Sequence, residues 1–90
     1  MNNLRHSETA LKHAAVIRSM IDDLERTILI LHIDICTEEE RVRVFDKADP
    51  LYSILARSLG ARSENLKTTV ADLKRRLTWL TANESLLAAA

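Results

Sequence analysis

The side chains best suited to chemistry in this 90-residue chain are its three histidines and its single cysteine. His6 and His13 are seven residues apart, a spacing that would place them on one face of a helix. Because zinc takes three or four protein ligands, two imidazoles alone make a poor metal site. We interpret both histidines as solvated surface residues.

His32 and Cys36 lie in or beside an apolar segment, and neither sits in a pattern typical of catalysis. A phosphorelay histidine on a helical hairpin is conceivable, but His32 is followed by Ile33 and not by an acidic residue. Cys36 has no Lys or Arg within one helical turn that would favour its thiolate, so we interpret it as a small core residue.

Acidic and phosphate-binding patterns add no catalytic candidate. Glu38, Glu39 and Glu40 are consecutive and would fan around a helix, so they predict a solvated face. The sequence shows no glycine-rich phosphate loop and no Ser/His/Asp set. We therefore expect no catalytic residue, no metal ion and no cofactor, and a protein that is not an enzyme.

The composition favours long helices in one domain, residues 1–90. Thirteen basic and thirteen acidic side chains cancel, so no net field attracts nucleic acid or an anionic membrane. One Gly, one Pro and three aromatic residues argue against sheets and barrels. With no disulfide, no apolar leader and no apolar run long enough to span a bilayer, we expect a cytoplasmic protein without membrane insertion.

Two heptad patterns predict the helices that must position any functional residue. Apolar residues recur at alternating steps of three and four in both halves of the chain, which is the seam of a coiled coil. The first series is Ala14, Ile17, Ile21, Leu24, Ile28, Leu31 and Ile35. The second is Tyr52, Ala56, Leu59, Ser63, Leu66, Val70, Leu73, Leu77, Leu80, Glu84 and Leu87, with two polar members.

Asp49-Pro50 predicts the turn, because Asp is a favoured N-cap and Pro fits the first helical position. We therefore expect a helix over about 7–46, a turn over about 47–50 and a helix over about 50–84, followed by a frayed C-terminal tail. A short connection makes the two helices antiparallel neighbours. Folding the chain about this turn pairs Phe45 with Tyr52, Leu31 with Leu66, Ile28 with Val70, Leu24 with Leu73, Ile21 with Leu77, Ile17 with Leu80, Ala14 with Glu84 and Ala10 with Leu87.

Two segments fit a second interpretation. The sequence 37–40, Thr-Glu-Glu-Glu, resembles a capping box that could start a new helix, and 27–35 is rich in β-branched residues that favour a strand. The heptad continues through both, so we predict one uninterrupted helix.

Six apolar residues do not fit the seam of a two-helix hairpin. We propose them as an interaction surface, because several exposed apolar side chains in one patch usually mark a binding site. They would pack against a second copy, giving a four-helix bundle, or against a partner's helix; a third or fourth short helix folding back is the alternative. The residues are Leu29, Ile30, Ile33, Val44, Leu51 and Ile54.

A helix-turn-helix DNA-binding regulator is the alternative function. Ala56, Gly60 and Leu66 have the spacing of that motif, in which Gly makes the turn between two helices. Arg62 and Lys67 would then contact phosphates, with Lys74, Arg75 and Arg76 nearby. This alternative predicts a helix break at 60–62, whereas the hairpin predicts a continuous helix.

The stretch from Met20 to Leu77 resembles the FliJ-type flagellar export proteins of α-proteobacteria. The resemblance lies in Met20-Ile21, Asp34-Ile35, Glu39-Glu40-Arg41, Asp46, Tyr52, Ala56, Arg62, Asn65-Leu66, Leu73 and Leu77. It implies an antiparallel coiled-coil hairpin in a cytoplasmic type III export apparatus, similar to the central stalk of rotary ATPases. The implied partners are the export ATPase and an export-gate component. We therefore expect an adaptor or chaperone-like interaction protein.

Overall fold

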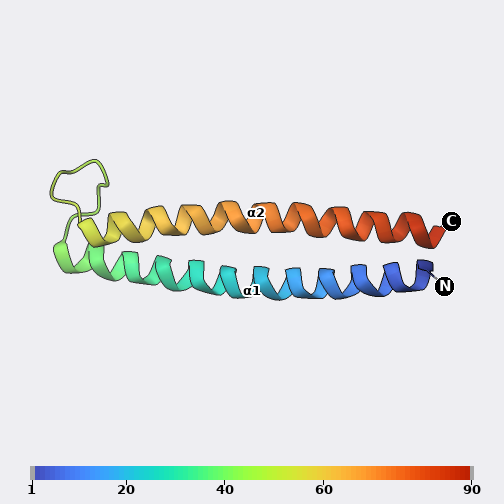
Figure 1. Ribbon diagram of the computed structural model, residues 1–90. Coiled ribbons are helices and arrows are strands. Elements are labelled where there is room, and N and C mark those ends of the chain that lie inside the picture. The colour runs from blue at the N-terminus through green and yellow to red at the C-terminus, as the bar shows by residue number, and fades with distance from the viewer. Residues whose placement is uncertain (1, 90) are drawn as a thin grey trace.

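Two long helices joined by one loop make up the computed structural model, which describes the backbone of residues 2–89 and the side chains of residues 8–82. Helix α1 spans Asn2–Val42 and helix α2 spans Ile54–Ala89. The helices lie side by side and run antiparallel, with the loop at one end and both termini at the other (Figure 1). The molecule is a rod 63 Å long. The predicted all-α hairpin is confirmed, and residues 2–89 contain no third helix that folds back.

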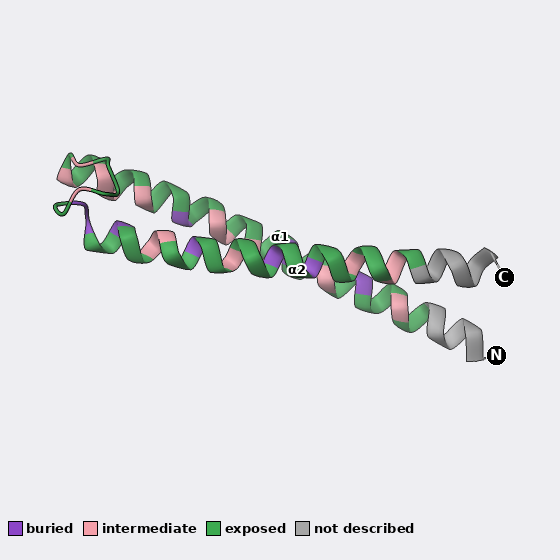
Figure 2. Cartoon of the chain, turned by 90° about the horizontal axis from the view of Figure 1, so that it is seen from above, coloured by how far each residue is buried: buried purple, intermediate pink, exposed green. Residues whose placement is uncertain are grey.

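The core lies along the seam between the helices, where buried positions recur on both of them (Figure 2). Its centre is Ile21, Val70 and Leu73, against which Ile17, Leu24, Ile28 and Leu77 pack. They include both members of three predicted pairs: Ile28 with Val70, Leu24 with Leu73, and Ile21 with Leu77. Outside the core, Glu25 of α1 and Lys74 of α2 form an ion pair of 3.0 Å that links the same turns. The predicted pairs that include Glu84 and Leu87 lie outside the described side chains.

The segment that could have been a strand and the segment that could have started a new helix are both helical. Helix α1 runs without interruption through 27–35 and through the Thr37 to Glu40 segment. Helix α2 continues through Gly60, although glycine weakens a helix by about 1 kcal/mol relative to alanine. Ser63, a polar member of the predicted seam, is buried at a position that faces α1.

Helix α1 ends earlier than predicted, at Val42 and not near residue 46. The cause is Arg43, whose backbone has a positive φ of 60° and whose N–H donates to the carbonyl of Glu39 at 2.8 Å. This is a left-handed C-terminal cap, a conformation usually taken by glycine. Because the cap residue is an arginine, the sequence carries no stop signal there.

The connection is a loop over 43–53 and not the expected four-residue turn. Two consecutive turns build it: Asp49 N–H donates to the Asp46 carbonyl at 3.0 Å, and Tyr52 N–H donates to the Asp49 carbonyl at 3.0 Å. The carboxylates of Asp46 and Asp49 accept from the N–H groups of Ala48 and Leu51, both at 2.9 Å. Pro50 therefore takes the second position of a turn, which its fixed φ also suits.

Helix α2 starts at Ile54, so the predicted start at Asp49-Pro50 is wrong. Ser53 is the N-cap: its hydroxyl accepts from the N–H of Ala56 at 3.1 Å. Phe45 and Tyr52, predicted as a facing helical pair, both belong to the loop. Tyr52 is buried, whereas Phe45 is exposed.

Neither helix, over the part of the chain that the structure describes, has an apolar stretch long enough to cross a bilayer.

Candidate interaction surface

Three of the predicted interaction residues form a patch on the side of α1 that faces away from α2. Leu29, Ile30 and Ile33 are 59%, 57% and 55% exposed, whereas the seam residue Leu31 between them is 4% exposed. Residues 29 and 33 are one helical turn apart, and residue 30 lies beside them. The structure thus brings these three together; we call them the back patch.

The other predicted interaction residues lie at the loop end of the hairpin. Leu51 and Ile54 are 76% and 85% exposed, because one lies in a turn and the other is the first residue of α2. Val44, in the loop, is half-buried. Phe45 and Leu55 are also exposed here, and Phe45 was not predicted to be. We call Leu51, Ile54 and Leu55 the loop-end group; it is separated along the rod from the back patch.

Hydrogen bonds to two glutamates of α1 hold the start of α2. Ser53 donates to Glu38 Oε1 at 3.0 Å, and the Tyr52 hydroxyl donates to Glu39 Oε2 at 2.9 Å. Arg41 donates two bonds of 2.8 Å to the Glu38 carboxylate. The bonds from Arg41 and Ser53 lower the pKa of Glu38 to about 2. Burial, and then the bond to Glu39 and its charge, raise the pKa of Tyr52.

Consecutive glutamates 38–40 were predicted to form a solvated face, and the structure corrects this for two of them. Glu38 and Glu39 are half-buried and serve the loop, while Glu40 is exposed and pairs with Arg43 at 3.2 Å. Their partners could not be predicted from the sequence, because these contacts depend on the path of the loop. Their role is structural: they fix the loop on α1.

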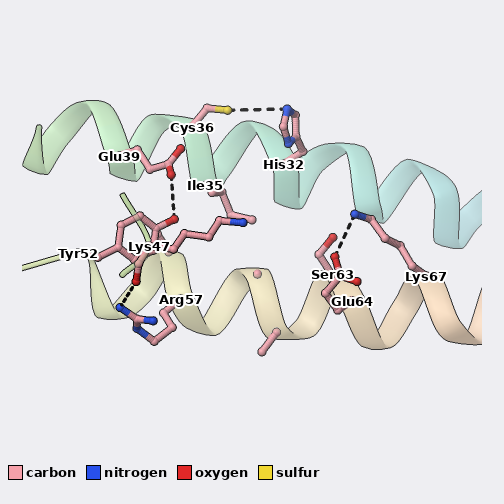
Figure 3. Close-up of a pocket in the computed structure, with 13 residues that line it drawn as sticks. His32, Ile35, Cys36, Glu39, Lys47, Tyr52, Arg57, Ser63, Glu64 and Lys67 are labelled. Carbon is pink, nitrogen blue, oxygen red and sulfur yellow. Dashed lines mark hydrogen bonds and ion pairs between the residues drawn. The ribbon is translucent and has the colours of Figure 1, made fainter. Parts of the chain in front are cut away.

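A cleft lined by both polar and apolar side chains lies between the helices next to the loop (Figure 3). Gly60 forms part of its wall, and a Cβ there would meet nothing within 4 Å, so the missing side chain leaves room. Arg57 spans the loop side: it lies 5.3 Å from the centre of the Tyr52 ring and donates to the Lys47 carbonyl at 2.9 Å. On the α2 side, Lys67 pairs with Glu64 at 3.2 Å.

The α1 side of this cleft carries His32 and Cys36, one turn apart, with Nε2 and Sγ 3.8 Å from each other (Figure 3). Cys36 is exposed, so its interpretation as a core residue is wrong. Sequence reasoning also missed this contact, although the four-residue spacing was a sufficient signal for it. Among the described residues, no group of three or more His, Cys, Asp and Glu side chains is arranged to hold a metal ion.

An apolar groove lies toward the other end of the hairpin. Val16 and Ile17 of α1 and Trp79 and Leu80 of α2 line it, with His13 and Arg76 as the remaining members. Trp79 is 64% exposed, an unusual position for so large an apolar side chain. Sequence reasoning missed this groove, whose signal was a tryptophan directly before the seam residue Leu80. His13 is exposed as predicted, and the His6 side chain lies outside the described residues.

The candidate DNA contacts lie on a continuous helix. The break that a helix-turn-helix requires at 60–62 is absent, because α2 is helical from Ile54 to Ala89. Arg62 and Lys67 are both exposed, and Lys67 already pairs with Glu64. The neighbouring Arg75 also pairs with an acidic residue, Asp72. The arrangement thus lacks the turn that would present a recognition helix.

Comparisons with protein-family models, with curated proteins and with solved structures found no match. The resemblance to the FliJ-type family therefore remains a prediction.

Proposed function

We propose that this protein is a non-catalytic interaction protein that binds helices, and that it self-associates through the back patch into a four-helix bundle. The observation that carries the proposal is the exposure of Leu29, Ile30 and Ile33, at 55–59%, on one face of a regular helix. A rigid helix that presents adjacent apolar side chains is suited to packing against another helix.

The narrowness of the core supports the same proposal. Among the described side chains, only seven apolar residues are buried, because a two-helix hairpin can cover one stripe of each helix. Small domains with so limited a core commonly gain further stability by oligomerisation. Packing a second hairpin on α1 would supply that second layer.

The size of the back patch predicts a reversible association. Full burial of a Leu or Ile side chain contributes about 1.5–3 kcal/mol, and somewhat more than half of each side chain is still exposed. Six such side chains, three from each copy, would then contribute about 5–10 kcal/mol. This gain is comparable to the entropic cost of association, about 4–15 kcal/mol, so the dimer should depend on concentration.

The test is a double substitution, Ile30→Asp with Ile33→Asp, analysed by sedimentation velocity. Buried unpaired carboxylates are strongly disfavoured, so the variant should remain monomeric at concentrations where the unmodified chain associates. Circular dichroism verifies that the variant keeps its helices. The matched control, Thr69→Asp with Ala71→Asp, adds the same charge at exposed positions of α2 and should associate normally. Equal association of variant and unmodified chain would contradict the proposal.

The same back patch would also bind a partner protein. Following the resemblance, we propose an export ATPase or an export-gate component of a flagellar or type III export system as that partner. Mixing the purified proteins and measuring binding by calorimetry tests it, with the Ile30→Asp, Ile33→Asp variant as the control that should lose binding. Absence of binding by the unmodified chain would contradict this part alone.

A further inference from the structure

His32 and Cys36 are arranged as two ligands of one metal ion. Their Nε2 and Sγ atoms lie 3.8 Å apart on adjacent turns of α1, and both side chains are exposed (Figure 3). The same four-residue spacing on one helical face serves in known zinc sites of helices. Imidazole nitrogen and cysteine sulfur are the ligands that zinc prefers in structural sites.

The separation of the two atoms fits tetrahedral zinc. Zinc binds sulfur at about 2.3 Å and imidazole nitrogen at about 2.0–2.1 Å, which places the two ligand atoms roughly 3.5–3.6 Å apart at the tetrahedral angle. The observed 3.8 Å differs from this by a few tenths of an ångström. A small side-chain rotation would therefore be enough for both atoms to bind one ion.

The remaining two ligands would have to come from another molecule. Among the described residues no third His, Cys, Asp or Glu completes a site with this pair. The pair borders the back patch, since Ile33 follows His32 directly and lies one turn from Cys36. Association through the back patch would thus bring the pairs of two copies toward a shared two-fold axis.

We propose that a Zn²⁺ ion bridges two copies of this chain, with His32 and Cys36 from each copy as its four ligands. This inference rests on the proposed self-association and adds a bound Zn²⁺ ion to the interface between the two copies. Each Cys36 thiol releases its proton to solvent and binds as the thiolate, while each neutral His32 binds through the lone pair of Nε2. No redox step is involved, and the two thiolates balance the charge of the ion.

The experiment measures self-association of the full chain by sedimentation velocity, in a non-thiol reductant, with either EDTA or added Zn²⁺. With free Zn²⁺ at about 100 times its dissociation constant from the dimer, the dimer should tighten about 100-fold. Calorimetry should give one Zn²⁺ for every two chains. With Co²⁺ as the probe, a thiolate-to-metal charge-transfer band should appear.

Variants show whether these residues hold the ion. Cys36→Ser and His32→Ala should each abolish the zinc effect on association, and Cys36→Ser should also remove the Co²⁺ band. His13→Ala, which changes another exposed histidine of α1, should leave the zinc effect intact. Because residues 32 and 36 are exposed, both variants should fold, and circular dichroism verifies this.

Two results would overturn the inference: metal binding that survives Cys36→Ser, or a zinc effect on association that is absent in the unmodified chain. The measurement in EDTA separates this inference from the proposed function. If the chain dimerises in EDTA and added Zn²⁺ does not strengthen the dimer, the metal bridge alone is refuted. A monomer in EDTA that zinc converts to a dimer supports the bridge and contradicts association through the back patch alone.

Discussion

Replacement of Ser53 by alanine tests how this hairpin is closed. The Ser53 side chain is buried, and from the loop it forms hydrogen bonds with both α1 and α2. Its hydroxyl oxygen accepts from the N–H of Ala56 at 3.1 Å, which caps α2, and the same hydroxyl donates to Glu38 Oε1 of α1 at 3.0 Å. The Ser53→Ala change removes both bonds while leaving the backbone path available.

The magnitude follows mainly from the cap. Loss of a serine N-cap costs about 1 kcal/mol, within a range of about 0.5–2 kcal/mol. For a domain of this size, each 1 kcal/mol lowers the midpoint of thermal unfolding by about 4–8 °C. We therefore expect Ser53→Ala to lower the midpoint by about 4–8 °C, with Glu38 keeping its bonds to Arg41.

The assay is thermal unfolding followed by circular dichroism, with all variants at one protein concentration because association would shift the midpoint. Ser58→Ala is the matched control: this serine is exposed on α2, and alanine is the better helix former there. Its midpoint should be unchanged or slightly raised. If Ser53→Ala unfolds at the same temperature as Ser58→Ala, the assignment of Ser53 as the cap is refuted.

Three further predictions concern the core, the helix and the dependence on pH. Leu73→Ala should lower the free energy of unfolding by about 2–5 kcal/mol in urea titrations, because Leu73 lies in the core, whereas Leu11→Ala at an exposed site should change it by less than about 0.5 kcal/mol. Gly60→Ala should raise the free energy of unfolding by about 1 kcal/mol, because the residue is helical and a Cβ there meets nothing within 4 Å; a loss of stability would argue for a special turn at this position. The pKa of Glu38 is lowered from 4.5 to about 2, so its contribution to stability is present above pH 4.5 and is lost as the pH falls toward 2. Urea titrations across this interval should show a steeper loss in the unmodified chain than in Glu38→Gln, and parallel curves would contradict the role of this carboxylate.

The helical hairpin could be predicted from the sequence because the heptad signal is long and redundant. Ile21, Leu24, Val70 and Leu73 are members of two series that agree with one another along many turns. An error of a few residues in the turn leaves the facing pairs almost unchanged, provided that the centre of the connection stays in place. The observed loop, 43–53, is centred close to the predicted turn. The central core residues were therefore identified correctly, although the helix ends were not.

The helix ends could not be predicted, because their signals were ambiguous or missing. Asp49-Pro50 suits both a helix start and a β-turn, and only the fold selects the turn. Ser53 lacks a Glu or Gln three residues later, since that position is Ala56, so it does not form a recognisable capping box. Arg43 takes a left-handed conformation that sequence patterns associate with glycine.

The candidate surfaces were predictable only in part, for a related reason. Leu29, Ile30 and Ile33 stand out because they are apolar residues off the seam of a regular helix. The contact of His32 with Cys36 could have been predicted from their four-residue spacing, whereas the exposure of Trp79 beside the apolar groove depends on how the two helices pack. Exposure of Leu51 and Ile54 was predicted, yet the loop that exposes them was not.

The measurement that tests the proposed function most directly is sedimentation of the unmodified chain in EDTA over a range of micromolar concentrations. The proposal predicts a mass that rises with concentration from the monomer value of 10.2 kDa toward twice that value. Fluorescence emission from the single tryptophan, Trp79, can be followed in the same samples to show whether the apolar groove beside it is covered as well. A mass of 10.2 kDa at every concentration would contradict self-association through the back patch.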